Sequence, residues 1–144
     1  MRVLVFGSRD WEHREQVFSL LDGLLLNHTL HCACLGEDEE FVVIEGQCPY
    51  GGADKHAEDW AKMAASGHPM IPWKFTVEHL PFPANWDKHK KAAGPIRNRE
   101  MAFKGKPTVA YGFINKPLAE SRGSKDMWEV ATGANIPTYL IWRM

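Results

Sequence analysis

The sequence predicts an α/β fold, with a mostly parallel five-stranded sheet and helices on both of its faces. Two observations predict it. Short, mainly apolar runs typical of buried strands alternate along the chain with longer segments whose apolar residues recur at helical spacing. Strand and helix follow each other in strict alternation until a last strand closes the chain, and this order implies parallel strands in a three-layer sandwich.

The expected strands are short apolar runs, several of them rich in β-branched residues. They cover residues 2–6 (RVLVF), 41–44 (FVVI), 75–80 (FTVEHL), 108–113 (TVAYGF) and 136–142 (IPTYLIW). No internal repeat, low-complexity tract or linker separates them, so a single domain over residues 1–144 is expected.

The expected helices occupy residues 11–26, 51–66, 87–103 and 124–133. The third contains Gly94-Pro95, which predicts a loop or kink because proline lacks the backbone N–H that a helix interior uses. Alternatively, the pair marks the start of a helix that follows it. Residues 31–40 (HCACLGEDEE) are expected to form a loop with a solvated acidic end.

Composition and charge exclude several classes of protein. The chain of 144 residues has a formal net charge of −1, so it lacks the overall basic field that nucleic-acid binding uses. No apolar run reaches membrane-spanning length, and the N-terminus lacks the small-residue cleavage site of a signal peptide. Three cysteines, an odd number, argue against a disulfide framework and for a reducing compartment. A cytoplasmic protein without a membrane partner is therefore expected.

One segment raises the question of a metal site. Cys32 and Cys34 lie close in sequence to His28 and His31, which are residue types that bind zinc. Their spacing matches no known zinc motif, and the alternative is a pair of half-buried thiols. We predict no metal and no cofactor.

Ligands in parallel α/β folds bind beyond the carboxyl ends of the strands, so the loops that follow the strands are the place to look. After the first strand, Gly7, Ser8 and Arg9 (in GSRDW) form either a phosphate site at a helix start or a plain turn with a serine cap. After the second, Gly51 and Gly52 precede Asp54, which either favours the helix dipole or accepts ribose hydroxyls.

Two further loops are basic. SRGSKDM, after the fourth strand, resembles a phosphate-binding turn, and AAGPIRNREM, after the third, concentrates arginines in a nearly neutral chain. Arginine forks suit phosphate, so together these loops predict a local pocket for an anionic ligand. No Walker motif is present, which argues against a P-loop NTPase. Trp11 and Trp86 flank the loops and are candidates either for stacking on a base or for simple burial.

These motifs together resemble the YspA-type branch of the SLOG superfamily. VFGSRDW, GQCPYGGAD, WDKHKKAAGPIRNREM and SRGSKDM carry the resemblance, which spans nearly the whole chain. It implies a Rossmann-like fold that binds a nucleotide or nucleotide-derived ligand, such as an ADP-ribose-like compound, a cyclic nucleotide signal or a nucleoside monophosphate. It also implies a homo-oligomer, and a sensor or sequestering role in a phage or mobile element.

The residues that the motifs assign to this small-molecule ligand form one set. It comprises Gly7, Ser8, Arg9, Gly51, Gly52, Asp54, Arg97, Asn98, Arg122, Gly123, Ser124 and Lys125.

An alternative implied by the resemblance is a LOG-like phosphoribohydrolase that cleaves the N-glycosidic bond of a nucleotide. Arg97 is then the functional arginine, and Asp126 or Glu100 the candidate catalytic carboxylate. The catalytic glutamate of the LOG enzymes has no clean match here, and Glu45 is a further candidate acid or only a salt-bridge partner. For this reason binding is weighed above catalysis. DNA binding like that of DprA relatives is disfavoured, because only a local basic cluster is available.

Overall fold

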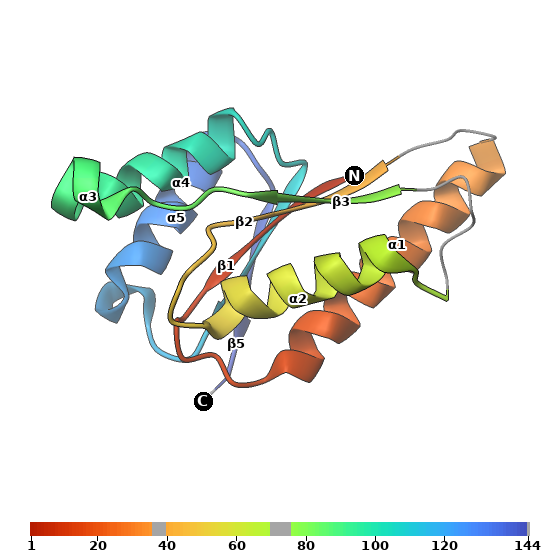
Figure 1. Cartoon of the computed structure of the whole chain (residues 1–144), viewed down its shortest axis with the longest axis horizontal. Coiled ribbons are helices and arrows are strands. Elements are labelled where there is room, and N and C mark those ends of the chain that lie inside the picture. The colour runs from red at the N-terminus through yellow and green to blue at the C-terminus, as the bar shows by residue number, and fades with distance from the viewer. Residues whose placement is uncertain (36–39, 70–75, 144) are drawn as a thin grey trace.

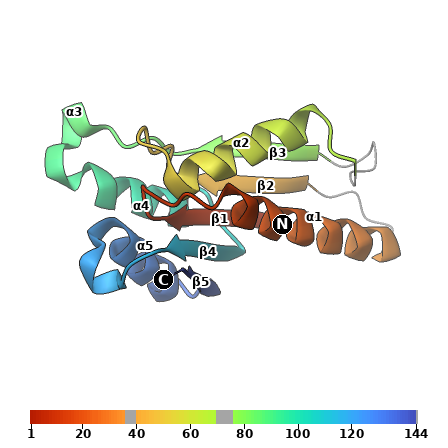
Figure 2. The ribbon, with the colours of Figure 1, turned by 90° about the horizontal axis from the view of Figure 1, so that it is seen from below.

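The computed structural model describes residues 1–35, 40–69 and 76–143. Its sheet has five parallel strands in the order β3-β2-β1-β4-β5, and Figure 2 shows them in this order across the molecule. The strands are β1 (Arg2–Gly7), β2 (Glu40–Glu45), β3 (Thr76–Pro81), β4 (Val109–Ile114) and β5 (Thr138–Trp142). The predicted α/β sandwich with a parallel sheet is confirmed.

The helices cover both faces of this sheet. They are α1 (Arg14–Leu35), α2 (Gly52–Ser66), the single-turn α3 (Trp86–His89), α4 (Ala93–Phe103) and α5 (Arg122–Gly133). In Figure 1, α1 and α2 lie to one side of the sheet and α4 and α5 to the other. None of the helices in the described ranges is long and apolar enough to span a bilayer.

The strand order places a switch point beside β1. The chain adds β2 and β3 on one side of β1 and then crosses back to place β4 on its other side. The loops after β1 and β4 therefore leave toward helices on opposite faces, and a crevice opens between their carboxyl ends. The fold thus creates a ligand-sized opening where the predicted motifs lie.

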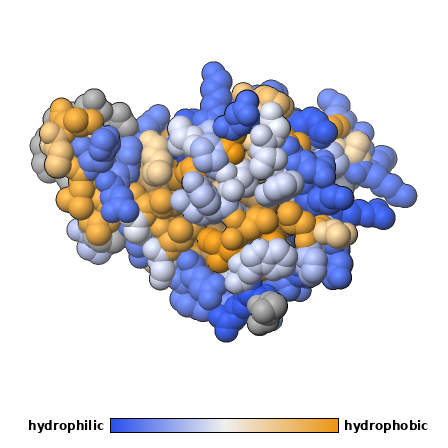
Figure 3. All heavy atoms as spheres, turned by 180° about the vertical axis from the view of Figure 1, so that it is seen from behind, coloured by the Kyte–Doolittle hydropathy of each residue, from blue (hydrophilic) through white to orange (hydrophobic). Residues whose placement is uncertain are grey.

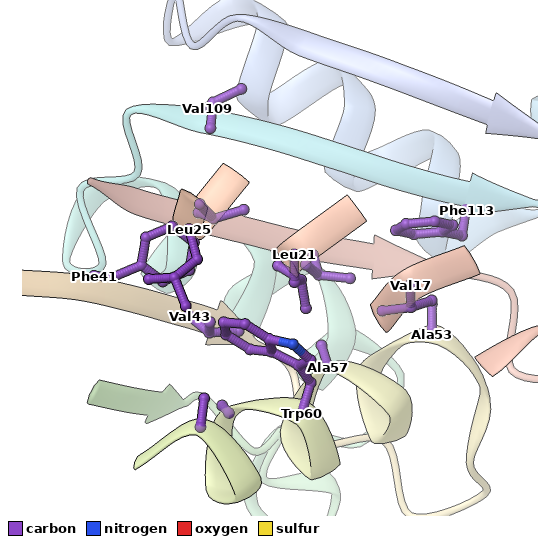
Figure 4. Packing of buried hydrophobic residues seen from close by; sticks show 14 of the residues in the cluster. Val17, Leu21, Leu25, Phe41, Val43, Ala53, Ala57, Trp60, Val109 and Phe113 are labelled. Atoms are coloured by element: carbon purple, nitrogen blue, oxygen red, sulfur yellow. The ribbon is translucent and has the colours of Figure 1, made fainter. Parts of the chain in front are cut away.

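The larger core fills the face under α1 and α2. Trp60 of α2 packs against Phe41 with ring centroids 5.7 Å apart, and Figure 4 shows it close to Val43 and the leucines of α1. The Trp60 indole N–H also donates to Asp22 Oδ1 at 2.9 Å, so the buried ring keeps its polar atom satisfied. Small residues such as Ala57 and Ala61 let α2 lie close to the strands.

The opposite core is smaller and uses methionine and alanine. Met101 of α4 and Met127 of α5 pack with Ala131 against Leu4 and Ile44 of the sheet. The two helices also contact each other, so their amino-terminal halves form one wall of the crevice.

The first helix is longer than predicted. It continues to Leu35, so Cys32 and Cys34 lie in its last turns rather than in a loop. Its buried residues continue the helical spacing from Leu21 through Leu25 to Cys32, which explains the extra turns. Residues 36–39 of the acidic run lie outside the described residues.

The predicted break at Gly94-Pro95 is wrong. Helix α4 begins at Ala93 and runs through both residues. The α-helical backbone is interrupted earlier, at Lys90, where φ is +53°. Pro95 falls in the first turn of α4, where a missing N–H costs no intrahelical bond. The alternative that the pair marks a helix start is confirmed.

Gly52 is expected to tolerate no side chain. Its φ is +79°, and an added Cβ would lie 2.6 Å from the carbonyl carbon of Arg9. Gly52→Ala should lower the free energy of unfolding by roughly 2–4 kcal/mol, because left-handed strain adds to overpacking. In Gly23→Ala, on α1, the added Cβ meets open space, so this control should raise stability by about 0.5–1 kcal/mol. Urea unfolding measures both, and equal effects would contradict the expectation.

Candidate functional site

A cavity of about 500 Å³ opens at the crevice between the ends of β1 and β4. We call it the first cavity, and its size lies in the range of about 300–1,000 Å³ usual for small-molecule sites. Its lining residues come from the end of β1, from the loops that follow β1, β2 and β4, from the start of α2, from α4 and from the first half of α5: Phe6, Gly7, Ser8, Arg9, Asp10, Cys48, Asp54, Arg97, Asn98, Met101, Lys116, Glu120, Ser121, Arg122, Gly123, Ser124 and Met127.

Ser8, which lines the first cavity, is held by hydrogen bonds to β4, to α2 and to the residue that follows β4. Its N–H donates to the Phe113 carbonyl at 2.9 Å, and its own carbonyl accepts from Ala53 N at 3.3 Å. Its hydroxyl accepts from Asn115 N at 3.3 Å. Gly7 has a φ of +153°, and a Cβ there would clash with the carbonyl group of Phe113. The β1 loop therefore packs directly on β4 and α2.

The start of α5 forms the opposite wall. Residues 121–124 all line the first cavity, and the amides of the first turn of an α-helix have no intrahelical acceptor, which favours an anion there. Asn98 holds this turn against α4, because its Nδ2 donates to Asp126 Oδ2 at 2.9 Å and to the Gly123 carbonyl at 3.4 Å. Asn98 is itself 3% exposed, so this clamp is shielded from water.

Arg97 reaches from α4 toward the end of β2. Its Nη1 donates to the Gly46 carbonyl at 2.5 Å, and its Nε donates to Asn98 Oδ1 at 3.1 Å. Within the described residues its Nη2 forms no hydrogen bond, which leaves the two N–H groups of that nitrogen for a ligand. Gly46 makes this approach possible, since a Cβ there would clash with Nη1 and lie 2.9 Å from Asp54 Oδ2.

Two carboxyl groups near Arg97 are hard to ionise. Burial raises the pKa of Asp54 to about 7, although the Arg97 charge and the backbone N–H groups of Cys48 and Gly46 act in the opposite direction. Burial, with a smaller contribution from the Glu58 charge, also raises the pKa of Glu45 to about 7. Asp54 lines the first cavity, so this cavity contains a carboxyl that exchanges its proton near neutral pH.

Glu45 is fully buried and paired with His79. Its Oε1 lies 2.7 Å from His79 Nε2, and its other oxygen accepts from the backbone N–H of Gln47. Burial lowers the pKa of His79, which favours the neutral imidazole. A neutral imidazole beside a protonated carboxyl satisfies both groups without leaving a buried charge.

A second cavity, of about 450 Å³, adjoins the first and shares Arg9, Cys48 and Arg97 with it. Its other walls come from the loop after β2, from α2 and from the loop after β3: Gly46, Gln47, Pro49, Tyr50, Lys55, Glu58, Pro83, Ala84 and Trp86. Two of these side chains, Tyr50 and Trp86, are large aromatics that remain exposed.

The first cavity brings together most of the residues that sequence patterns assign to a ligand. Gly7, Ser8, Arg9, Asp54, Arg97, Asn98, Arg122, Gly123 and Ser124 all line it.

Three other residues of that predicted set lie outside the lining of the first cavity. Gly51 and Gly52 shape the turn into α2, where Gly52 packs on the backbone of Ser8 and Arg9. Lys125 lies 4.0 Å from Glu129 on the exposed side of α5. Their predicted contact with a ligand remains a prediction.

The other residues that the sequence analysis proposed for catalysis or for stacking lie in different surroundings. Asp126 accepts from Asn98 behind the cavity wall, and neither it nor Glu100 lines the first cavity. Trp11 is 1% exposed in the core and is not available for stacking on a base, whereas Trp86 is 46% exposed.

The possible metal ligands do not gather into a site among the described residues, where no group of three His, Cys, Asp or Glu side chains converges. Cys32 is buried, with its Sγ 3.7 Å from His28 Nε2, and Cys34 is exposed.

Sequence reasoning missed several residues of the site. Lys116 and Glu120 line the first cavity from the loop after β4, and Asp10 and Cys48 line it from the loops after β1 and β2. Their position directly after strands was the signal that could have found them. His79 had no such signal, since it alternates within β3 like an ordinary strand residue.

Glu45→Gln should change the pH dependence of stability. A carboxyl whose pKa rises from 4.5 to about 7 on folding binds its proton more tightly in the folded state. The wild-type free energy of unfolding should therefore fall as pH rises from about 4.5 to 7. The amide of glutamine mimics the protonated acid, donating to His79 and accepting from Gln47. The variant should gain roughly 2–3 kcal/mol over wild type above pH 7 and little below pH 4.5.

Urea unfolding at pH 5 and pH 8 measures this difference. Glu129→Gln, on the exposed side of α5, is the control and should leave the pH slope unchanged. A Glu45→Gln slope identical to wild type would show that Glu45 ionises normally.

Comparison with known proteins agrees with the fold and with the motifs. Residues 1–89, from β1 through α3, match the family described as the YspA, cpYpsA-related SLOG family. The chain is also 34% identical over 137 residues to the Gene 61 protein of Mycobacterium phage D29, which covers 94% of this chain and 92% of the phage protein. The chain belongs to the YspA, cpYpsA-related SLOG family.

Proposed function

We propose that this protein is a single ligand-binding domain that holds a phosphate-bearing nucleotide or nucleotide-derived ligand in the first cavity, as a sensor or sequestering protein. Membership of the SLOG family suggests a nucleotide-related ligand. One observation carries the proposal: Ser8, the first turn of α5 and the cationic side chains of Arg97 and Arg122 converge on one cavity at the switch point of the sheet.

The lining of the first cavity offers donors to an anion and a carboxyl to a hydroxylated group. Arg122, the amides of Gly123 and Ser124, and the Ser8 hydroxyl supply donors for phosphate. Asp54 offers a carboxyl to ribose hydroxyls across the cavity. Arg97 lines the same cavity with Nη2 available, so it can bind either a second phosphate or a carboxylate of the ligand.

The candidate ligands are those that carry both groups: an ADP-ribose-like compound, a cyclic nucleotide signal or a nucleoside monophosphate. The similarity to a phage protein supports a phage or mobile-element origin. In that setting, sequestering a nucleotide signal of the host is a role that needs binding without turnover.

Loss of the Arg122 guanidinium should weaken binding. Arg122→Ala removes a charge-assisted bond to phosphate and should raise the Kd of the ligand by about tenfold or more. Arg99→Ala is a matched control, because Arg99 is exposed, donates to the Pro95 carbonyl at 3.0 Å and does not line the first cavity. The same net charge is lost in both variants, so only a local contact distinguishes them.

Isothermal titration against a library of AMP, ADP, ADP-ribose and cyclic nucleotides measures this effect. Absence of binding to every compound at millimolar concentration would contradict the proposed function. Equal weakening by Arg122→Ala and Arg99→Ala would contradict the phosphate site at α5.

A second candidate function, N-glycosidic hydrolysis of a nucleotide, is favoured by one observation. Asp54 lines the first cavity with a pKa of about 7, the range in which a carboxyl can donate a proton to a departing base. Cleavage of this bond passes through an oxocarbenium-like state that also needs anionic stabilisation. Of the catalytic residues proposed from sequence, Arg97 lines the cavity while Asp126 and Glu100 do not, so Asp54 replaces them as the proposed acid.

The hydrolase candidate is tested by chromatographic detection of free base. If the protein is a hydrolase, Asp54→Asn should reduce base release by about a hundredfold or more, the lower range for removal of a general acid. Asp126→Asn serves as the comparison and should have a much smaller effect. No release of base from any bound nucleotide by the wild-type protein would rule this function out.

The surface of the structure bears on two further kinds of partner, a second copy of this chain and DNA. We propose self-association through apolar surface left uncovered by the fold: Leu26, Leu30 and Leu35 of α1 are exposed, and Figure 3 shows apolar surface crossing the face opposite to that of Figure 1.

DNA binding is disfavoured, since the cations of the first cavity alternate with Asp10, Asp54 and Glu120 rather than forming an extended basic surface.

A further inference from the structure

Resting on the proposed function, we propose that the second cavity binds a second ring-bearing half of the same ligand. The preferred ligand class is then two nucleosides joined through phosphates, rather than a mononucleotide. The two cavities, of about 500 and 450 Å³, share Arg9, Cys48 and Arg97, so one ligand can extend across them. Each cavity alone is large enough for a small ligand.

Trp86 supplies a flat surface that the fold holds in place. It begins α3, and Asn85 Oδ1 caps this turn by accepting from Lys88 N at 3.1 Å. An added Cβ at Gly94 would lie 3.5 Å from Cη2 of Trp86, so the indole rests against the first turn of α4. The residue is nevertheless 46% exposed. An aromatic ring that is positioned but uncovered is suited to stacking on a base.

Tyr50 adds a second aromatic surface from the loop after β2. It is 76% exposed, and the guanidinium of Arg9 lies 5.5 Å from its ring centroid. Arg9 lines both cavities, so this cation–π pair marks their junction. Phosphates that link two nucleosides would cross this junction between Arg9 and Arg97.

The character of the second cavity differs from that of the first. Its walls include Pro49 and Pro83 beside the two aromatics, with Lys55 and Glu58 on the α2 side. Apolar rings with a charged pair at one edge match a base, which has two flat faces and a polar rim. The first cavity, by contrast, is built around the first turn of α5 and suits phosphate.

The test compares ADP with diadenosine diphosphate by isothermal titration, together with the equivalent guanine pair. Both compounds carry two phosphates, and the dinucleotide adds a second nucleoside in place of the ionisable terminal oxygen of ADP, so a tighter dinucleotide is not explained by charge. Stacking of one base on an aromatic side chain is worth a factor of roughly 5 to 150 in affinity. We expect the dinucleotide to bind wild type about tenfold tighter than the mononucleotide or better.

Trp86→Ala should reduce this preference to less than about threefold, and Trp86→Phe should restore most of it, since a phenyl ring still stacks. Trp142→Ala is the control, because Trp142 is also about half exposed but lies at the end of β5 and lines neither cavity. A dinucleotide that binds no tighter than ADP, or a preference that survives in Trp86→Ala, would overturn the inference.

The two proposals fail in different ways. If ADP binds and Arg122→Ala weakens it, but the dinucleotide gains nothing, the second-cavity inference falls and the proposed function stands. If neither compound binds in either base series and the nucleotide library also gives no signal, both are overturned.

Discussion

The Arg97 guanidinium acts on the buried carboxyl groups of Glu45 and Asp54, and the same side chain lines both cavities. Its Nη1 bond to the Gly46 carbonyl joins α4 to the end of β2, and its Nε bond to Asn98 continues to α5 through Asp126. One side chain thus connects the sheet edge with both helices of one layer. Because Arg97 is only partly buried, its charge is shared between these protein groups and the two cavities that it lines.

The glycines around Arg97 explain how so many polar groups meet in a small volume. Gly46 leaves room for Arg97 and Asp54 above its Cα, and Gly52 lets the start of α2 press on the backbone of Ser8 and Arg9. Gly7 does the same where β1 meets Phe113. Side chains at these positions would separate the β1 loop from β2, β4 and α2. The crevice therefore depends on the close packing of neighbouring backbone segments, which these glycines permit, more than on the length of its loops.

The sequence was sufficient to predict the fold and the sheet edge at which the first cavity lies, for clear physical reasons. Strand and helix alternation determines a parallel sheet, and a parallel sheet places the loops after its strands at one edge. Ser8, Arg97 and Ser124 could be assigned in this way without knowing any distance.

Burial and pairing across the chain could not be predicted in the same way. Trp11 and Trp86 occupy similar loops in the sequence, yet one packs in the core and the other is left exposed. His79 meets Glu45 only because β3 lies beside β2 in register. The catalytic role proposed for Asp126 depended on alignment with other enzymes, and the local pattern gives no sign that Asn98 binds its carboxyl group.

The protonation of the two carboxyls determines how Arg97 meets a ligand. Below about pH 7, Asp54 and Glu45 are largely protonated, so the charge of Arg97 is not balanced by either of them. An anionic phosphate then supplies the missing negative charge, and its arrival raises the pKa of both carboxyls further. Above that pH the carboxylates themselves balance Arg97 and repel the anion. The proposed ligand binding would therefore be coupled to proton uptake, because one guanidinium would serve both the buried carboxyls and the ligand.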